Sequence, residues 1–203
     1  MIGQAVKQAA LDIWDELLHL ILFNMIWFLG AILIIPIPYL TFGLVYTAYD
    51  VVEGKSIKIG AFFNHANRTW KQAYIWGGIN LVVVVLLWFN LAFYTGVNAD
   101  WAIILRLFIV ALSIFWGVLQ IIVLPIYPHL EEPGLKNAYR NALILIGRYP
   151  LAVLTLLFFI VLFAVLSFFL QALPILLTFA ALAVLATRLM KILVQEELER
   201  IGN

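Results

Sequence analysis

Histidines and a pair of adjacent glutamates are the residues of this sequence whose types could support metal binding or acid–base chemistry. His65 and His129 both fall near the same predicted membrane surface, and Glu131 and Glu132 follow His129 closely. If these side chains converge, they could hold a divalent metal or exchange protons. The interpretation we favour is that they, like His19, are solvated histidines at a membrane surface.

Other catalytic patterns are missing from the sequence. The apolar runs contain no paired carboxylates, no HExxH motif, and no Ser, His and acid set that could form a nucleophile and its base. The zero cysteine count excludes disulfides, thiolate metal sites and Cys nucleophiles. We therefore predict no catalytic residue, no cofactor and no metal site, and expect that the protein is not an enzyme.

A second group of polar residues lies inside the apolar runs, where a transported solute or ion would need ligands. Amide side chains at such depth more often form hydrogen bonds between helices, which contribute on the order of 0.6 kcal/mol each. The arginine of this group follows Trp101 closely enough for its side chain to reach the membrane surface. The candidate intramembrane polar residues are Asn24, Asn80, Asn90, Arg106 and Gln120.

Basic residues form a third group, on two amphipathic segments at residues 56–72 and 135–148. Each segment has apolar residues at helical spacing and Lys, Arg and Asn on the opposite side, which is typical of helices lying at a membrane surface. These cations could bind anionic lipid headgroups or a membrane partner, or they could only set the orientation of the chain. The candidate lipid- or partner-facing residues are Lys58, Arg68, Lys71, Lys136 and Arg140.

The composition indicates that lipid surrounds most of the chain. Of its 203 residues, 66% are hydrophobic and only 11% are charged, far from the balance of soluble domains. This length allows one integral membrane domain, residues 1–203, with five or six spans and little else. The net charge of +1 gives no indication of a nucleic-acid partner.

The apolar runs predict an all-α, polytopic bundle with five long spans, a short second span and two cytoplasmic amphipathic helices. An interfacial helix leads into the first span, which ends at Pro36 and Pro38 because proline lacks a donor and restricts the residue before it. Whether the short segment crosses the bilayer stays open. The predicted spans are residues 17–35, 41–52, 73–94, 101–124, 151–170 and 175–193.

Orientation follows from the distribution of Lys and Arg, which favour the cytoplasmic side of short loops. Basic residues occur in the two amphipathic connections and in the tail, whereas the turns around Asn98 and Gln171 contain none. We predict a cytoplasmic C-terminus. The N-terminus is also cytoplasmic if residues 41–52 cross the membrane, which is the arrangement we expect.

Short motifs, most of them at helix ends, are spread along nearly the whole chain. They are Leu22 to Trp27, Pro36 to Gly43, Gly54, Phe62 and Phe63, Asn67 to Gln72, Pro125 to Tyr127, Lys136 to Ala138, and Pro150. Together these motifs resemble the YesL-like family of small bacterial membrane proteins of unknown function, although the second proline that usually follows the family's glycine is missing, since Leu44 follows Gly43. The resemblance implies a multi-pass protein of the bacterial cytoplasmic membrane whose relatives often accompany sugar-uptake transporters. It supplies no active site.

Together these patterns favour a non-catalytic accessory or scaffold protein that contacts membrane lipid, with a membrane transporter complex as the partner that the resemblance implies. The polar chemistry is concentrated on surface segments, whereas the spans contain no convergent ionisable cluster. The alternative function is a small-solute transporter or channel subunit, in which the intramembrane polar residues would line a path.

Overall fold

The computed structural model describes residues 1–202, and all of the regular structure in that range is helical. The absence of strands among these residues confirms the all-α prediction. The helices are α1 (Ile2–Asp15), α2 (Leu17–Ile32), α3 (Ile37–Val52), α4 (Ile59–Thr95), α5 (Asp100–Ile126), the 3-10 turn η1 (Tyr127–His129), α6 (Leu135–Arg148), α7 (Pro150–Phe169), the π-helical turn η2 (Pro174–Thr178) and α8 (Phe179–Gly202).

Four helical segments are long and apolar enough to cross a membrane, which fits a multi-pass membrane protein. A fifth is counted if α1 and α2, which meet at an angle of 86°, act as one broken span. Alone, α2 has 16 residues and ends at Ile32, so it is shorter than the predicted span of residues 17–35. The four segments are Ile59–Thr95, Asp100–His129, Pro150–Phe169 and Pro174–Arg200.

The break after α2 has a local cause in the sequence. Pro36 and Pro38 cannot donate backbone hydrogen bonds, and each disfavours helical geometry in the residue before it. Ile34 takes a left-handed conformation with φ of 63°, so the chain reverses there and α3 starts at Ile37. The predicted bend is confirmed, and it comes a few residues earlier than the end predicted for the first span.

The short helix α3 is the central helix of the fold rather than a lipid-facing span. Ten of its 16 residues are buried, and it packs mainly against α4 and α8. At 1.5 Å per residue it is about 24 Å long, less than the hydrocarbon thickness of about 30 Å. Neighbouring helices therefore cover a segment that the sequence alone marks only as a short apolar run.

Helix α4 corrects the prediction of an amphipathic helix at residues 56–72 followed by a separate span at 73–94. Residues Ile59–Thr95 form one continuous helix of 37 residues, about 55 Å long. No proline interrupts this stretch, and Gly77 and Gly78 are tolerated inside it because the backbone hydrogen bonds continue. At Ala73 the composition changes from amphipathic to predominantly apolar, but the helix continues across this position.

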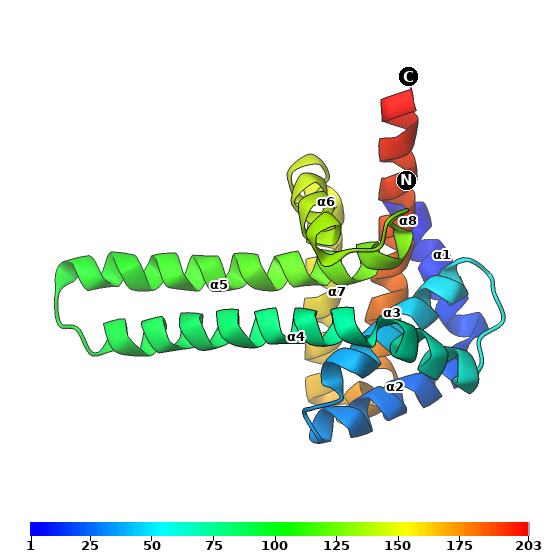
Figure 1. The fold of residues 1–203 in the computed structure, drawn as a ribbon, viewed down its shortest axis with the longest axis horizontal. Helices are drawn as coiled ribbons and strands as arrows, with labels where there is room; N and C mark the ends of the chain where they lie inside the picture. Colours follow the sequence, from blue (N-terminus) through cyan, green and yellow to red (C-terminus); the bar gives the residue numbers. More distant parts are fainter. Residues whose placement is uncertain (203) are drawn as a thin grey trace.

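The second half of α4 and the first half of α5 form a two-helix arm that extends away from the other helices (Figure 1). Its side chains are largely exposed, Trp88 and Phe108 among them, and none of the most apolar window of α4 is buried. Helices α7 and α8 run across the direction of this arm (Figure 1). The apolar helices therefore cannot all lie along one bilayer normal.

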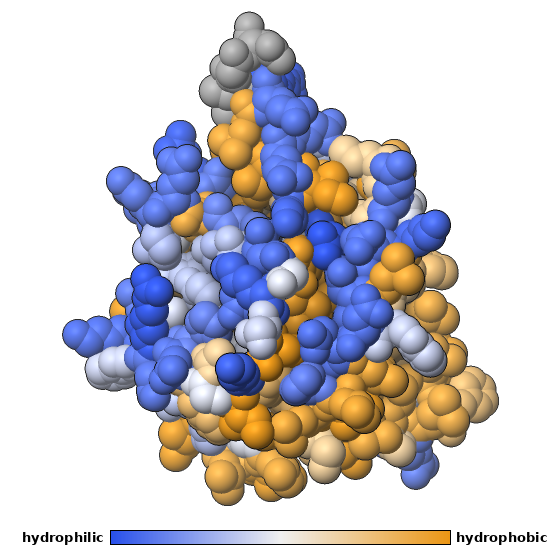
Figure 2. All heavy atoms as spheres, turned by 90° about the vertical axis from the view of Figure 1, so that its right-hand side faces the viewer, coloured by the Kyte–Doolittle hydropathy of each residue, from blue (hydrophilic) through white to orange (hydrophobic). Residues whose placement is uncertain are grey.

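The core consists of two clusters of buried residues that meet at α8. One joins α1, α5, α6, α7 and α8 and includes one residue each of α3 and α4, and the other joins α2, α3, α4 and α8. Helix α1 packs along α8, and the N-terminus lies beside the last turns of α8 (Figure 1). Hydrophilic residues cover much of the upper part of the face in Figure 2, whereas its lower part is apolar.

Candidate functional site: charged surfaces and buried polar contacts

The five predicted lipid- or partner-facing basic residues are all exposed. Lys58 directly precedes α4, Arg68 and Lys71 lie on its first half, and Lys136 and Arg140 lie on α6. Within residues 1–202 none of the five forms a salt bridge with a carboxylate. We call these five residues the free basic set.

The apolar sides of the two amphipathic segments are covered in part by protein, and other apolar side chains on them stay exposed. In α4, Phe62 and Ala66 are fully buried and pack against Gly43 of α3, where an added Cβ would come within 3.2 Å of both. In α6, Ala138 and Ala142 are fully buried in the cluster that includes α5. The apolar side chains left exposed on these segments include Ile59, Phe63, Trp70, Leu143 and Ile144.

Other charged residues of the same helices are paired, and the pairs join different helices. His65 Nε2 on α4 lies 2.6 Å from Asp50 Oδ2 on α3, and Lys55 approaches the other oxygen of Asp50 at 3.4 Å. Lys191 of α8 lies 3.0 Å from Glu53, just after α3. These pairs fix the ends of α3, α4 and α8 relative to one another.

Arg188 of α8 forms the least exposed ion pair, with Asp12 of α1. Its Nε donates to Asp12 Oδ2 at 2.8 Å, and the two side chains are 13% and 10% exposed. Arg188 lies inside the predicted last span, yet it is missing from the predicted intramembrane polar residues. The signal in the sequence is the charge of Arg188, one of two basic residues in an otherwise uncharged run, because a charge at that depth needs a partner.

Gln120 lies at the centre of a polar network between α4, α5 and α6. Its Oε1 accepts hydrogen bonds from Trp76 Nε1 at 2.9 Å, Asn80 Nδ2 at 3.3 Å and Tyr139 OH at 3.1 Å. Trp116 Nε1 donates to Asn80 Oδ1 at 3.0 Å. Burial raises the pKa of the Tyr139 phenol, so the phenol keeps its proton and donates at neutral pH.

Asn24 of α2 stabilises the irregular start of the last helical segment. Its Nδ2 donates to the carbonyl oxygens of Pro174 and Ile175, both at 2.8 Å, and its Oδ1 accepts from the backbone N–H of Ala180 at 2.9 Å. A π-helical turn leaves backbone groups without their usual α-helical partners. The fully buried Asn24 amide supplies those partners and joins α2 to η2 and α8.

The remaining two intramembrane candidates lie on the arm and bond only their own helices. Asn90 donates to the carbonyl of Leu86 at 2.7 Å and stays exposed. Arg106 Nε donates to the carbonyl of Ala102 at 3.3 Å. The structure therefore brings Asn80 and Gln120 together and leaves Asn24, Asn90 and Arg106 at separate places.

The histidines do not converge on one site. His65 pairs with Asp50, His19 with Glu16 at 2.8 Å, and His129 Nε2 lies 3.2 Å from the carbonyl of Thr187. In the part of the chain that the structure describes, no three His, Asp or Glu side chains group in a way that could hold a metal ion. His129 lines one groove together with Glu131 and Glu132, whereas His65 does not line it and pairs with Asp50 of α3, so the structure brings together only part of this set.

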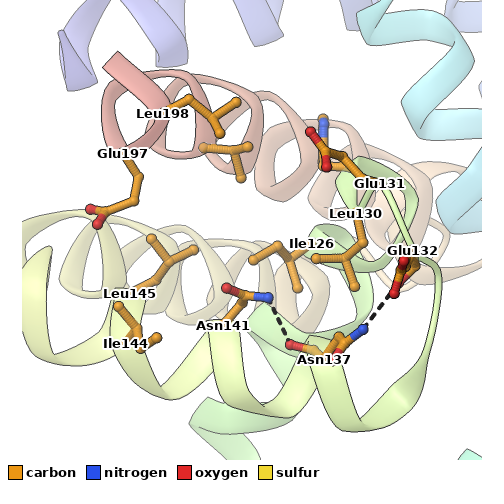
Figure 3. A pocket seen from close by; sticks show the side chains of 12 residues that line it. Ile126, Leu130, Glu131, Glu132, Asn137, Asn141, Ile144, Leu145, Glu197 and Leu198 are labelled. Atoms are coloured by element: carbon orange, nitrogen blue, oxygen red, sulfur yellow. Dashed lines mark hydrogen bonds between the residues drawn. The ribbon is translucent and has the colours of Figure 1, made fainter. Parts of the chain in front are cut away.

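A groove with a volume of about 370 Å³ lies between α6 and the last part of α8 (Figure 3). Glu131 and Glu132 from the connection before α6 lie at one end, and Glu197 of α8 lies at the other. Apolar side chains lie between them. Glu131 and Glu132 stand out in the sequence as adjacent carboxylates, whereas nothing in the local sequence pairs them with Glu197, more than sixty positions away.

Comparisons with protein-family models, curated proteins and solved structures found no match to this chain. The resemblance to the YesL-like family therefore stays a prediction.

Proposed function

We propose that this chain is a non-catalytic accessory or scaffold protein of the bacterial cytoplasmic membrane. Its free basic set binds anionic lipid headgroups or acidic segments of a membrane partner. By the resemblance to the YesL-like family, that partner is a sugar-uptake transporter. The charged surfaces and the C-terminus face the cytoplasm, and so does the N-terminus. The last residue, Asn203, lies outside the described residues.

The observation that carries this proposal is the division between paired and free charges. Asp12, Asp50, Glu53 and Glu197 each contact a basic residue of another helix or of the adjoining connection, whereas the five residues of the free basic set form no salt bridge with a carboxylate of the described residues 1–202. Exposed cations near an anionic membrane surface each contribute about 1 kcal/mol of attraction. Charges that do not hold the fold together are available for that role.

The polar groups inside the bundle favour the accessory role over the alternative of a small-solute transporter or channel subunit. The amide groups of Asn24 and Asn80 and the oxygen of Gln120 are occupied by hydrogen bonds between helices or to the backbone. A solute path needs polar groups that can exchange partners with the solute. Here those groups stabilise helix packing.

Anionic-lipid enrichment around the purified protein tests the proposal. The variant Arg68→Gln/Lys71→Gln/Lys136→Gln/Arg140→Gln is placed in nanodiscs that contain labelled phosphatidylglycerol among zwitterionic lipids. Energy transfer from the protein to the labelled lipid reports local enrichment. We expect the enrichment to fall by about fivefold for each charge that contacts lipid, and to fall for the wild type at high ionic strength.

The matched control exchanges Arg for Lys and Lys for Arg at the same four positions, so that every positive charge is kept: Arg68→Lys/Lys71→Arg/Lys136→Arg/Arg140→Lys. It should retain most of the enrichment. Equal enrichment for the neutral variant and the wild type, together with unchanged co-purification of membrane partners at low ionic strength, contradicts the proposal. Solute flux through the purified protein in liposomes favours the transporter alternative instead.

A further inference from the structure

The groove between α6 and α8 combines an apolar floor with acidic ends. Leu145 and Ile126 are almost fully buried at its base, so the floor is fixed by the core of the protein. The lining contains no Lys or Arg. The apolar lining residues are Ile126, Leu130, Ile144, Leu145, Val194 and Leu198, the carboxylates are Glu131, Glu132 and Glu197, and the other polar lining residues are His129, Asn137 and Asn141.

The two acidic ends differ in their charge balance. At one end, Glu197 forms a salt bridge with Arg148, and its Oε2 accepts a hydrogen bond from Tyr149 OH at 3.3 Å. At the other end, the exposed side chains of Glu131 and Glu132 form no salt bridge or side-chain hydrogen bond with any residue of the described chain 1–202. Negative charge is therefore unbalanced at the Glu131 and Glu132 end only.

Hydrogen bonds hold the walls of the groove in place. Asn137 Nδ2 donates to the backbone carbonyl of Glu132 at 3.3 Å, and Asn141 Nδ2 donates to the carbonyl of Asn137 at 2.9 Å (Figure 3). The salt bridge between Arg148 and Glu197 joins the last turn of α6 to α8. The groove therefore has fixed walls. Within the described chain, Glu131 and Glu132 lie without a basic partner at one end, apolar side chains lie in the middle, and the salt bridge between Arg148 and Glu197 lies at the other end.

We propose that this groove binds a small amphiphilic cation. Its ammonium group lies against Glu131 and Glu132, and its apolar body covers Ile126, Leu130 and Leu145. The volume falls in the range of small-molecule pockets, about 300–1,000 Å³. A helix from a partner protein would have to extend beyond both ends of the groove. The salt bridge between Arg148 and Glu197 lies across one of these ends. Charge complementarity and size therefore both favour a small cation.

Titration with hexyltrimethylammonium tests this site, with the full chain in nanodiscs of zwitterionic lipid. Tetramethylammonium, which has no tail, and hexylsulfonate, which has the opposite charge, are the comparison probes. We expect saturable binding of hexyltrimethylammonium only. The variant Glu131→Gln/Glu132→Gln should weaken that binding by about fivefold or more and make it less sensitive to ionic strength.

A matched control removes two exposed carboxylates outside the groove, Asp15→Asn/Asp100→Asn, and should bind as the wild type does. Asn141→Trp, which places a large side chain in the groove, should abolish binding while Glu131 and Glu132 are kept. Thermal unfolding identifies variants that fail to fold. Equal affinity of the wild type and the Glu131→Gln/Glu132→Gln variant overturns the proposal, and so does equal binding of tetramethylammonium or full binding to Asn141→Trp.

Discussion

Several buried polar side chains in this protein form hydrogen bonds or ion pairs to helices distant in sequence. Asn24 bonds the backbone around η2, and Asp12 bonds Arg188 from the opposite end of the chain. Without water, an unpaired amide or charge in such surroundings is costly, so each of these residues also fixes which helices are neighbours. This role predicts strong effects on stability from changes that remove the polar partner.

Asn24→Leu should destabilise the fold because it removes the partners of two carbonyls and one N–H in a buried place. A single unsatisfied buried group costs about 1–3 kcal/mol, so we expect a loss of at least that size. Thermal unfolding in detergent measures it. Asn90→Leu is the matched control, since Asn90 is exposed and bonds only its own helix, and it should change stability little. Equal losses for the two variants contradict the role given to Asn24.

Arg188→Gln should lower the free energy of unfolding by about 3–5 kcal/mol, because it leaves Asp12 charged and nearly buried without its partner. The double variant Asp12→Asn/Arg188→Gln removes both charges and should recover part of that loss. A double-mutant cycle measures the coupling between them. Arg140→Gln, on the exposed side of α6, is the control and should be close to neutral. Additive losses in the cycle mean that the pair does not stabilise the fold.

The sequence shows which amide side chains lie within apolar runs, but it does not show which residues they bond. The sequence marks Asn24, Asn80 and Gln120 as polar residues within apolar runs. Pairing Asn24 with Pro174 or Asp12 with Arg188 requires the packing of α2 and α1 against the last helix, and no local pattern encodes such distant contacts. Arg188 and Lys191 both lie near the end of the last apolar run, where basic side chains can reach the membrane surface, so the sequence does not distinguish a paired arginine from an exposed one.

At the scale of helices, close packing at two glycines sets how α3 approaches its neighbours. A Cβ added at Gly77 of α4 would lie 2.5 Å from Cγ of Pro38 in α3, whereas a Cβ added at the adjacent Gly78 has nothing within 4 Å. The sequence predicts only that this pair of glycines suits close helix approach. The structure assigns that contact to Gly77 alone.

Gly77→Ala and Gly78→Ala should therefore change stability in opposite directions. Gly77→Ala forces α3 and α4 apart and should cost about 1–3 kcal/mol. Gly78→Ala adds a methyl group in open space and replaces a poor helix former, which should stabilise by about 0.5–1 kcal/mol. Thermal unfolding of the two variants side by side measures both effects. A stabilising Gly77→Ala would show that Pro38 does not pack against this face of α4.

Helix boundaries followed from the sequence where proline or a polar turn marks them. The break before Pro36, the turn at Gly96, and the start of α7 at Pro150 were predicted and confirmed. The continuity of α4 across Ala73 was not, because a change in composition resembles a boundary when no partner helix is known. The π-helical turn η2 also has no sequence pattern that separates it from an ordinary helix start.

At the scale of the whole molecule, the arm of α4 and α5 and the pair α7 and α8 run in crossing directions (Figure 1). Hydropathy identifies each of these helices as a candidate span, yet it says nothing of the angle between them. Because the basic residues of α6 and of the first half of α4 lie away from both the arm tip and the apolar lower end, a tilted orientation places the two apolar ends toward the opposite side of the membrane. The turns at Asn98 and Gln171 then lie on the same side.

Labelling of single-cysteine variants tests this topology most directly, since the natural sequence contains no cysteine. A membrane-impermeant maleimide is added to intact cells that express Asn98→Cys, Gln171→Cys, Arg68→Cys or Lys136→Cys, and then to permeabilised cells. We expect Asn98→Cys and Gln171→Cys to react in intact cells, and Arg68→Cys and Lys136→Cys to react only after permeabilisation. Reaction of Arg68→Cys or Lys136→Cys in intact cells, or protection of either turn until permeabilisation, contradicts the proposed arrangement.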